Sequence, residues 1–396
     1  MLAGTHGDGA AKALRYQIEL GDAFAAEHMV EINRVHAPLT ELDGDNWFIS
    51  DLLKSGTRLK VIATTNPIYD VQYLQSIGSP EPEAAARLVS DVKGRFKEIG
   101  LKPTYNCTPE LGSNVPRINE IVAFSESSSI PYVNGVIGAR TNRESAKSAL
   151  AAAVTGRVPV YGLLLDENRK GNVLITVAAT LRDAFDYRLL GFAVGKMMGN
   201  GIPVFEGMPA NPLPEELKNL CTDLNVSAAV AMIHIVGLTP EAPTLDVAFG
   251  GKDPDRHFTV TDADLDKCRA DMSGYESGKI DFALFGCAHY TIEQIKKMAH
   301  LLEGKTLASG VELWVLTSPQ IRTMAEELGY LETISKAGGH IMGGGCSVMP
   351  VWNRRFDGKV GVTDSLKAKF YNSAKNISFR VMRMEQCIEA VLKGSC

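Results

Sequence analysis

Three of the seven cysteines in this 396-residue chain stand in loops that suit metal binding. Cys287 follows the apolar run 282–285 and a glycine, Cys346 follows a strand candidate and three glycines, and Cys107 lies in a proline-containing loop. Two of them therefore fall at the carboxyl ends of candidate parallel strands, where doubly wound sheets bind ligands. Three thiolates from separate loops suit an iron–sulfur cluster in which one iron stays open to substrate. No Cys-x-x-Cys pair is present, so the spacing alone leaves a plain zinc site open.

The other four cysteines have an ordinary structural interpretation. Cys221, Cys268 and Cys387 stand within helical patterns, and Cys396 is the last residue. The N-terminus lacks the basic and then apolar run of a signal peptide, so we expect a cytoplasmic protein. In that reducing compartment, and with an odd number of cysteines, a disulfide framework is not expected.

A polar segment from Tyr105 to Glu144 is the best candidate for binding a small anionic substrate. It ends in GARTNRE, which contains Arg140 and Arg143. A guanidinium group pairs with a carboxylate through two parallel hydrogen bonds, so these arginines are candidate carboxylate clamps. The alternative is that they form structural ion pairs with Glu126 or Glu144.

The composition argues against two classes of partner. Hydrophobic residues make up 45% of the chain and charged residues 22%, which is ordinary for a globular protein with a large core. The formal net charge is −5 at pH 7 and there is no run of Lys and Arg, so we expect no nucleic-acid partner. No apolar run is long enough to span a bilayer, so we expect no membrane partner.

Strands and helices alternate along much of the chain, which predicts a multi-domain α/β protein with mainly parallel, doubly wound sheets. We place the domain boundaries near Val158 and Lys279. They separate an N-terminal region at 1–157, with the first cysteine and the anion-binding segment, from a middle domain at 158–278 and a C-terminal domain at 279–396, with the other two cysteines. The clearest predicted elements are helices at 10–32, 80–99, 183–199 and 291–302, and strands at 59–63, 228–236, 280–285 and 311–317.

Three glycines recur every four residues within the predicted helix 183–199. They are Gly191, Gly195 and Gly199. Glycines at this spacing favour close packing of the helix against a sheet over contact with a ligand.

Several longer motifs follow one another along the chain. They are Cys107-Thr108-Pro109, Ser125-Glu126-Ser127, Asn134, Gly138 to Glu144, Tyr161-Gly162, His234 to Ala242, Gly286-Cys287-Ala288-His289, and Thr363 to Ala368 before Tyr371. In these motifs, and over nearly its whole length, the sequence resembles the aconitase X family, specifically the large catalytic subunit.

The resemblance implies a fold like the large-subunit domains of the aconitase superfamily and a hydro-lyase that uses an iron–sulfur cluster. The family pattern makes Cys107, Cys287 and Cys346 the cluster ligands, the same three that their positions select. Its bacterial members act on cis-3-hydroxy-L-proline and its archaeal members on a phosphorylated mevalonate, and we expect the first. Three cysteines suit a [4Fe–4S], a [3Fe–4S] or a [2Fe–2S] cluster, so the nuclearity stays open.

The sequence departs from the family pattern at two places beside the cysteines. Glu110 takes a position that is usually tyrosine, and Gly344-Gly345 replaces the usual Asp-Thr before Cys346. A carboxylate at Glu110 would repel a substrate phosphate or carboxylate, or pair with an amine, so we expect it to contact and select the substrate.

Elimination of water from a β-hydroxy acid needs a Lewis acid on the leaving hydroxyl, a base for the α-proton and cations on the carboxylate. His289 is a candidate proton donor, and a hydrogen bond that supports the cluster is the alternative. Lys367 is a candidate catalytic cation, and a solvated lysine is the alternative. The remaining candidates are Ser127 for catalysis and Glu126, Asn134, Thr141, Asn142 and Ser365 for substrate binding. For Asn142, helix capping is the alternative.

The resemblance places the base, a serine, on a swivelling domain outside this chain. In aconitase X that domain is a small second subunit or a fused extension, and this sequence ends soon after its last family motif. We therefore expect a heterodimer with a small subunit that carries the catalytic serine. A non-catalytic iron–sulfur protein with a binding or regulatory function is the alternative of another class.

Overall fold

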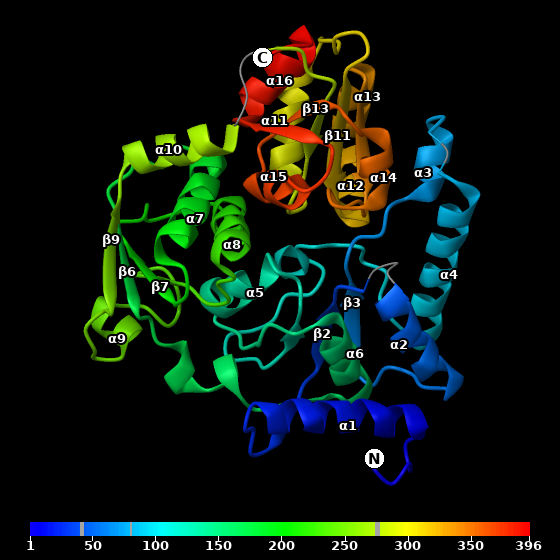
Figure 1. Ribbon diagram of the computed structural model, residues 1–396, viewed down its shortest axis with the longest axis vertical. Helices are drawn as coiled ribbons and strands as arrows, with labels where there is room; N and C mark the ends of the chain where they lie inside the picture. Colours follow the sequence, from blue (N-terminus) through cyan, green and yellow to red (C-terminus); the bar gives the residue numbers. More distant parts are fainter. Residues whose placement is uncertain (40–42, 80, 274–277) are drawn as a thin grey trace.

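Three parallel sheets follow one another along the chain in the computed structural model, which describes residues 1–39, 43–79, 81–273 and 278–396 (Figure 1). A short antiparallel pair, β1 (Met29–Glu31) with β5 (Arg157–Pro159), accompanies the first sheet. The prediction of an α/β protein with mainly parallel sheets is confirmed. Within the described ranges, no helix has the length and apolar character needed to cross a membrane.

The first sheet has the strand order β3-β2-β4, and all its pairings are parallel. Its strands are β2 (Arg34–Ala37), β3 (Ile62–Thr65) and β4 (Ala123–Phe124). The helices of this region are α1 (Asp8–Ala23), α2 (Asp43–Lys54), α3 (Val71–Ser76), α4 (Glu83–Ile99), α5 (Ser129–Pro131) and α6 (Ala146–Thr155), with a 3₁₀ turn η1 (Pro109–Leu111) and a π-helical turn η2 (Tyr132–Ile137). Helix α4 buries an apolar stripe, and Gly100, which follows its last residue, caps the helix in a left-handed conformation.

The second sheet has the order β8-β7-β6-β9, again all parallel. Its strands are β6 (Val173–Val177), β7 (Pro203–Glu206), β8 (His234–Ile235) and β9 (Arg256–Val260). Figure 1 shows α7 (Ala184–Met198) and α8 (Pro214–Ala228) on one side of this sheet. It shows α10 (Asp262–Ser273) at the upper end, above α7, and the short helix α9 (Leu245–Phe249) at the lower end. Asp183 begins α7 by accepting hydrogen bonds from two backbone N–H groups of its first turn.

The third sheet has the order β12-β11-β10-β13-β14 and is also parallel. Its strands are β10 (Phe282–Phe285), β11 (Glu312–Thr317), β12 (Gly339–Gly343), β13 (Val360–Thr363) and β14 (Ser378–Val381). Its helices are α11 (Ile292–Leu302), α12 (Pro319–Glu327), α13 (Tyr330–Lys336), α14 (Pro350–Arg355), α15 (Leu366–Asn372) and α16 (Met384–Lys393). Every residue of the central strand β10 is buried, as expected for a parallel strand covered on both faces.

One hydrophobic core joins the first region, which contains the first sheet and its helices, to the third region, which contains the third sheet and its helices. Ile68 and Leu74, before and within α3, belong to the same buried cluster as Trp314 of β11 and Trp352 of α14. This shared core holds two loops of the first region against the loops of the third sheet. One of the two follows β3 and the other precedes η1. The interface therefore brings together residues far apart in the sequence.

Five element predictions need correction. The strand predicted at 59–63 lies at Ile62–Thr65, where it forms β3. The helix predicted at 10–32 ends at Ala23, and the chain then turns to form β1, which pairs with β5. The helix predicted at 80–99 begins at Glu83 in the structure, and residue 80 lies outside the described ranges. The strand predicted at 228–236 shortens to β8, because α8 continues to Ala228 and Ala229 then takes a left-handed conformation.

The fifth correction concerns the glycines of α7. A Cβ on Gly191 would lie 2.4 Å from the carbonyl oxygen of Leu220, and one on Gly195 would lie 2.0 Å from Oγ of Ser227. Both neighbours belong to α8. The glycines therefore allow two helices to pack closely, where the sequence pattern had favoured packing of helix on sheet.

Candidate active site

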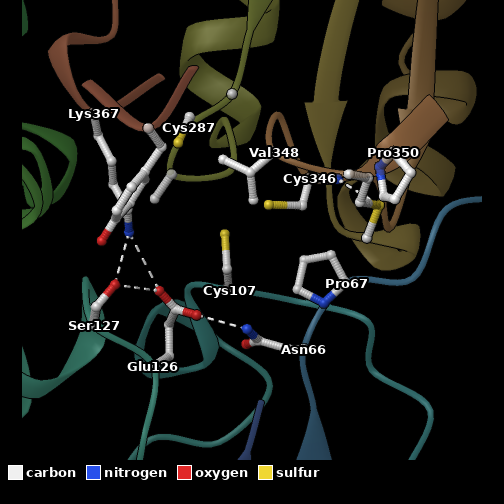
Figure 2. Close-up of a pocket in the computed structure, with 14 residues that line it drawn as sticks. Asn66, Pro67, Cys107, Glu126, Ser127, Cys287, Cys346, Val348, Pro350 and Lys367 are labelled. Atoms are coloured by element: carbon white, nitrogen blue, oxygen red, sulfur yellow. Dashed lines mark hydrogen bonds and ion pairs between the residues drawn. The ribbon is translucent and has the colours of Figure 1, made fainter. Parts of the chain in front are cut away.

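The three loop cysteines line one cavity of about 260 Å³ (Figure 2). Cys107 comes from the first region, and Cys287 and Cys346 come from the loops after β10 and β12. Figure 2 shows the three cysteines at the corners of a triangle, with Cys107 below Cys287 and Cys346. The other residues of the lining are Asn66, Pro67, Glu126, Ser127, Gly286, Ala288, Val348, Met349, Pro350, Lys367 and Tyr371.

Glycines and local hydrogen bonds set the course of the cysteine loops. Gly286 has φ +93°, and a Cβ there would lie 2.0 Å from the carbonyl oxygen of Leu316, so only glycine lets the chain turn into Cys287. The backbone N–H of His289 donates to Sγ of Cys107 at 3.3 Å, which links two of the loops. The carbonyl of Cys346 accepts a hydrogen bond from Nε1 of Trp352 at 2.7 Å.

All three thiols are held in the neutral form when no metal is bound. Burial raises the pKa of Cys107 well above its ordinary value. Burial and the neighbouring Cys287 raise the pKa of Cys346 to about 12, and burial also raises the pKa of Cys287. A thiol must lose its proton to bind a metal, so metal binding at these residues would release protons.

The donor set fits a polynuclear cluster better than a single ion. Among the described residues, no three His, Cys, Asp or Glu side chains lie close enough to share one metal ion. A polynuclear cluster bonds each cysteine to a different iron, so its ligands surround a space instead of meeting at a point. Three thiols around one cavity provide that arrangement, in a lining whose lysine offsets the negative charge of thiolates.

A buried ion pair faces the cysteines across the cavity. Nζ of Lys367 lies 3.4 Å from Oε1 of Glu126 and donates hydrogen bonds to Oγ of Ser127 at 2.9 Å and of Ser128 at 3.1 Å. Burial alone would raise the pKa of Glu126, but Lys367 and the hydrogen bonds from Asn66 and Ser128 outweigh it and lower the pKa to about 2. Burial would lower the pKa of Lys367, but Glu126 together with Cys287, Tyr371 and Cys107 outweighs it and raises that pKa. Both groups are therefore charged at neutral pH.

His36 does not line the cavity, but it contacts Asn66, which does. Its Nε2 lies 2.7 Å from Oδ1 of Asn66, and its Nδ1 lies 2.8 Å from Oγ1 of Thr64. Asn66 in turn donates to Oε2 of Glu126 at 2.6 Å. Strand β2, which carries His36, therefore fixes the orientation of the Glu126 carboxylate through one intervening side chain.

His289 lies among the cysteine loops, outside the cavity lining. Its Nε2 lies 2.7 Å from the carbonyl oxygen of Gly345, and its Nδ1 lies 3.2 Å from Oδ1 of Asn106. Burial lowers the pKa of His289 to about 4. The ring therefore bridges the residue before Cys346 and the residue before Cys107.

The two arginines predicted to clamp a carboxylate are not brought to this cavity. Arg140 donates to the carbonyl of Leu164 at 3.0 Å and pairs with Asp166 at 2.5 Å. Arg143 donates to the carbonyl of Ala229 at 2.9 Å. Neither arginine pairs with Glu126 or Glu144 in the interactions that the structure describes.

The polar residues within η2 and between the two arginines satisfy backbone groups of an irregular buried segment. Asn134 donates to the carbonyls of Thr141 and Ala231. Oγ1 of Thr141 accepts from the N–H of Phe124 at 3.0 Å. Asn142 donates to the carbonyl of Tyr161 at 3.0 Å and accepts from the N–H of Leu163 at 2.9 Å. The polar density that suggested an anion grip is explained by these backbone requirements.

Glu110 and Ser365 also lie behind the lining. Glu110 is 3% exposed on η1, and burial raises its pKa to about 7. Ser365 begins α15 as its N-cap, and its Oγ donates to the carbonyl of Cys287 at 2.5 Å. Of the predicted site residues, the cavity therefore gathers Cys107, Cys287, Cys346, Glu126, Ser127 and Lys367.

Sequence reasoning missed several residues that line the cavity or contact the residues around it. Asn66 follows β3 directly, and a polar residue at the carboxyl end of a parallel strand is a signal that should have been used. Arg188, Lys218 and Asp223 are fully buried on α7 and α8, and Lys218 donates to the carbonyl of His289 at 2.9 Å. In the sequence these charges look like positions on a solvated helix face.

Comparisons with known proteins agree with this arrangement. Three family models match in order: the aconitase X first domain at residues 1–167, the second domain at 171–270 and the third domain at 280–393. The crystal structure of Thermococcus kodakaraensis aconitase X in its holo-form superposes with a TM-score of 0.88 at 31% identity, covering 98% of this chain and 97% of that chain.

Curated relatives fall under two names. The phosphomevalonate dehydratase large subunit of Thermococcus kodakarensis is 31% identical, covering 98% of this chain and 97% of that protein. Its counterpart from Methanothermobacter thermautotrophicus is 34% identical, with coverage of 94% and 91%. The cis-3-hydroxy-L-proline dehydratase of Pseudomonas aeruginosa is 31% identical over 88% of this chain but only 61% of its own length.

Both names denote dehydratases, which are carbon–oxygen lyases, and aconitase-like hydro-lyases use an iron–sulfur cluster. Three family domains in order, full-length relatives and a matching structure lead to one conclusion: the chain belongs to the aconitase X family of hydro-lyases.

Proposed function

We propose that this chain is the large subunit of an iron–sulfur-dependent dehydratase that removes water from a small β-hydroxy acid. The observation that supports it is the single cavity that three buried cysteines share with the ion pair of Lys367 and Glu126. Thiols on one side and a fixed pair of opposite charges on the other suit a metal-assisted elimination from a charged substrate.

The proposed roles follow from the lining. Cys107, Cys287 and Cys346 would hold the cluster, which when bound supplies a Lewis acid for the leaving hydroxyl. Lys367 attracts the substrate carboxylate, and Ser127, which accepts a hydrogen bond from Lys367, orients that ammonium group. His289 holds the loops of Cys107 and Cys346 together through hydrogen bonds, which is the supporting role that the sequence left open. We further propose a [4Fe–4S] cluster with one open iron, because three ligands leave one iron of four without a cysteine.

The charges of the cavity favour cis-3-hydroxy-L-proline as substrate. Glu126 presents an ionised carboxylate that can pair with the ring ammonium, and Lys367 presents a cation for the carboxylate. No arginine among the described residues lines the cavity, and arginine is the usual partner of a phosphate group. The second candidate is a phosphorylated mevalonate, which the names and full-length coverage of the archaeal relatives favour.

A partner subunit completes the proposal. The relatives that this chain matches end to end are named large subunits, whereas the Pseudomonas aeruginosa enzyme contains a further part that this chain does not match. Lys367 is protonated and therefore a poor base for the α-proton. We propose that a small swivelling-domain subunit supplies the base, a serine.

The test is to co-express the chain with the small-subunit gene of its source and to purify the complex without oxygen. Iron and sulfide are measured, and dehydration of cis-3-hydroxy-L-proline and of phosphomevalonate is followed for the complex and the isolated chain. We expect iron and sulfide in the complex, activity on cis-3-hydroxy-L-proline, and little activity from the isolated chain. An active but iron-free complex would overturn the cluster, and full activity of the isolated chain would overturn the partner. Activity on phosphomevalonate alone would select the second candidate.

A further inference from the structure

A buried ion pair in the middle region lies directly behind the Cys287 loop. Nη1 of Arg188, on α7, lies 3.0 Å from Oδ2 of Asp223, on α8, and both side chains are fully buried. The close approach of α7 and α8 at Gly191 holds the two helices that carry the pair. Neither residue belongs to the cavity lining.

The pair contacts the backbone of two cavity residues. The same Nη1 of Arg188 donates to the carbonyl of Cys287 at 3.0 Å, and that carbonyl also accepts from Ser365. The second carboxylate oxygen of Asp223 accepts the backbone N–H of Lys367 at 2.9 Å. One ion pair therefore fixes the main chain at Cys287 and at Lys367. It does so from two helices, α7 and α8, that contribute no described residue to the lining.

Stability alone does not explain this pair. Taking two charges out of water costs about as much as their attraction returns, and well-packed apolar residues often stabilise a core equally well. In addition, Nε and Nη2 of Arg188 have no hydrogen-bond partner among the described residues, which adds a desolvation cost. A guanidinium group keeps its proton in proteins, and Nε of Arg188 also lies 3.9 Å from Oδ2 of Asp364, so its positive charge faces two carboxylates.

We propose that Arg188 and Asp223 are a positioning pair that sets Cys287 and Lys367 relative to each other and places a permanent positive charge behind one cluster ligand. This inference rests on the proposed function, since it concerns the cluster that the cysteines would hold. In the weakly polar interior a charge near Cys287 acts strongly on the electron affinity of that cluster. Reduction adds negative charge, so a nearby cation raises the reduction potential and a nearby anion lowers it.

The test compares Arg188→Gln, Arg188→Lys and Asp223→Asn in the complete two-subunit holoenzyme. The midpoint potential of the cluster is measured by a redox titration followed by electron paramagnetic resonance, together with iron content, kcat and KM. We expect Arg188→Gln to shift the potential downward and Asp223→Asn to shift it upward. Arg188→Lys keeps the charge and should retain the wild-type potential. Because misplacement of reacting groups lowers kcat by up to about 10²-fold, kcat should fall in all three variants. KM should rise as well, since the pair fixes the main chain of Lys367, which attracts the substrate carboxylate.

Arg169→Gln is the matched control. Arg169 is also fully buried and paired with a carboxylate, that of Glu241, but it contacts none of the cavity residues. This variant should lose stability without moving the potential. If Arg188→Gln does not fold, the double variant Arg188→Met with Asp223→Leu replaces both charges by apolar groups, and it should fold and still lose kcat.

Two outcomes separate this inference from the proposed function. A wild-type complex without a cluster or without dehydratase activity would remove the proposed function. A wild-type complex that is active, together with shifts of the same sign in Arg188→Gln and Asp223→Asn or with no shift and unchanged kcat, would overturn the positioning pair alone.

Discussion

Nζ of Lys367 lies 3.4 Å from Oε1 of Glu126, although the two residues are 241 positions apart in the sequence. Their side chains are 8% and 10% exposed, so this ion pair is shielded from water. It joins the helix that follows β13 to the segment that follows β4, across the cavity that the cysteines line. The contact therefore holds the first and third regions together and also presents both charges to a substrate.

The first prediction concerns this ion pair. Lys367→Met leaves a buried, unpaired carboxylate at Glu126, which should reduce the free energy of unfolding by about 3–5 kcal/mol. Glu126→Gln should cost less, because Lys367 keeps hydrogen bonds to two serines. The double variant should recover most of the stability that Lys367→Met loses, and yet remain inactive, since both charges that bind substrate are gone. Urea unfolding and the dehydration assay measure the two properties separately. An active double variant would show that the ion pair has only a structural role.

The second prediction concerns the cluster ligands. Cys107→Ser, Cys287→Ser and Cys346→Ser should each strongly lower the iron and sulfide content of the anaerobically purified complex, because an alcohol is a much weaker ligand than a thiolate. Cys268→Ser is the matched control: it is a buried cysteine of α10, outside this cavity. Its iron content should equal that of the wild type. Equal loss of iron in the control and in the loop variants would show that the effect comes from unfolding.

Most polar residues of the site could be predicted from one rule about parallel sheets. Asn66 follows β3, Glu126 follows β4, and Cys287, Cys346 and Lys367 come soon after β10, β12 and β13. The carboxyl ends of parallel strands are where such sheets bind ligands, so strand assignments suffice to place these residues at one edge. The rule could not tell that two separate sheets face each other, because that contact depends on a shared apolar core.

The anion-binding segment shows what the sequence does not contain. Arg140, Asn134 and Asn142 have the residue types of a substrate site, but all three donate to backbone carbonyls, and Arg140 also pairs with Asp166. Which backbone groups lack partners is decided by the fold, and no local pattern reports it. Arg188 and Asp223 show the converse: charges within helices suggest a solvated face, and tertiary packing buries them instead.

The third prediction is a pH dependence that arises from His36. Burial lowers the pKa of His36 to about 4, against the raising effects of Asn66 and Glu126, whereas in the unfolded chain its pKa is about 6.5. Between these values the unfolded state binds more protons, so stability is complete above pH 6.5 and falls as the pH drops towards 4. The loss attributable to His36 should approach about 3 kcal/mol.

His36→Gln isolates that contribution. The difference in unfolding free energy between wild type and variant, measured in urea for the metal-free chain at pH 7.5, 5.5 and 4.5, cancels groups that both proteins share. The wild type should lose its advantage as the pH falls. A difference that stays constant over this range would mean that His36 binds its proton equally well in the folded and the unfolded protein.

The last prediction tests the close packing of α7 and α8 with two glycines that both lie inside helices. A Cβ at Gly191 would lie 2.4 Å from the carbonyl oxygen of Leu220, which is backbone and cannot move aside, whereas Gly94 of α4 is exposed and has no atom within 4 Å of its added Cβ. Gly94→Ala should therefore stabilise the protein by about 0.5–1 kcal/mol, because alanine loses less backbone entropy in a helix. Gly191→Ala should destabilise it by about 1–3 kcal/mol or more through overpacking.

Thermal unfolding of the two variants should thus shift in opposite directions. A stabilising Gly191→Ala would show that α7 and α8 are further apart than described. Since α7 and α8 carry Arg188 and Asp223, Gly191→Ala should also lower dehydratase activity, and Gly94→Ala should leave it unchanged.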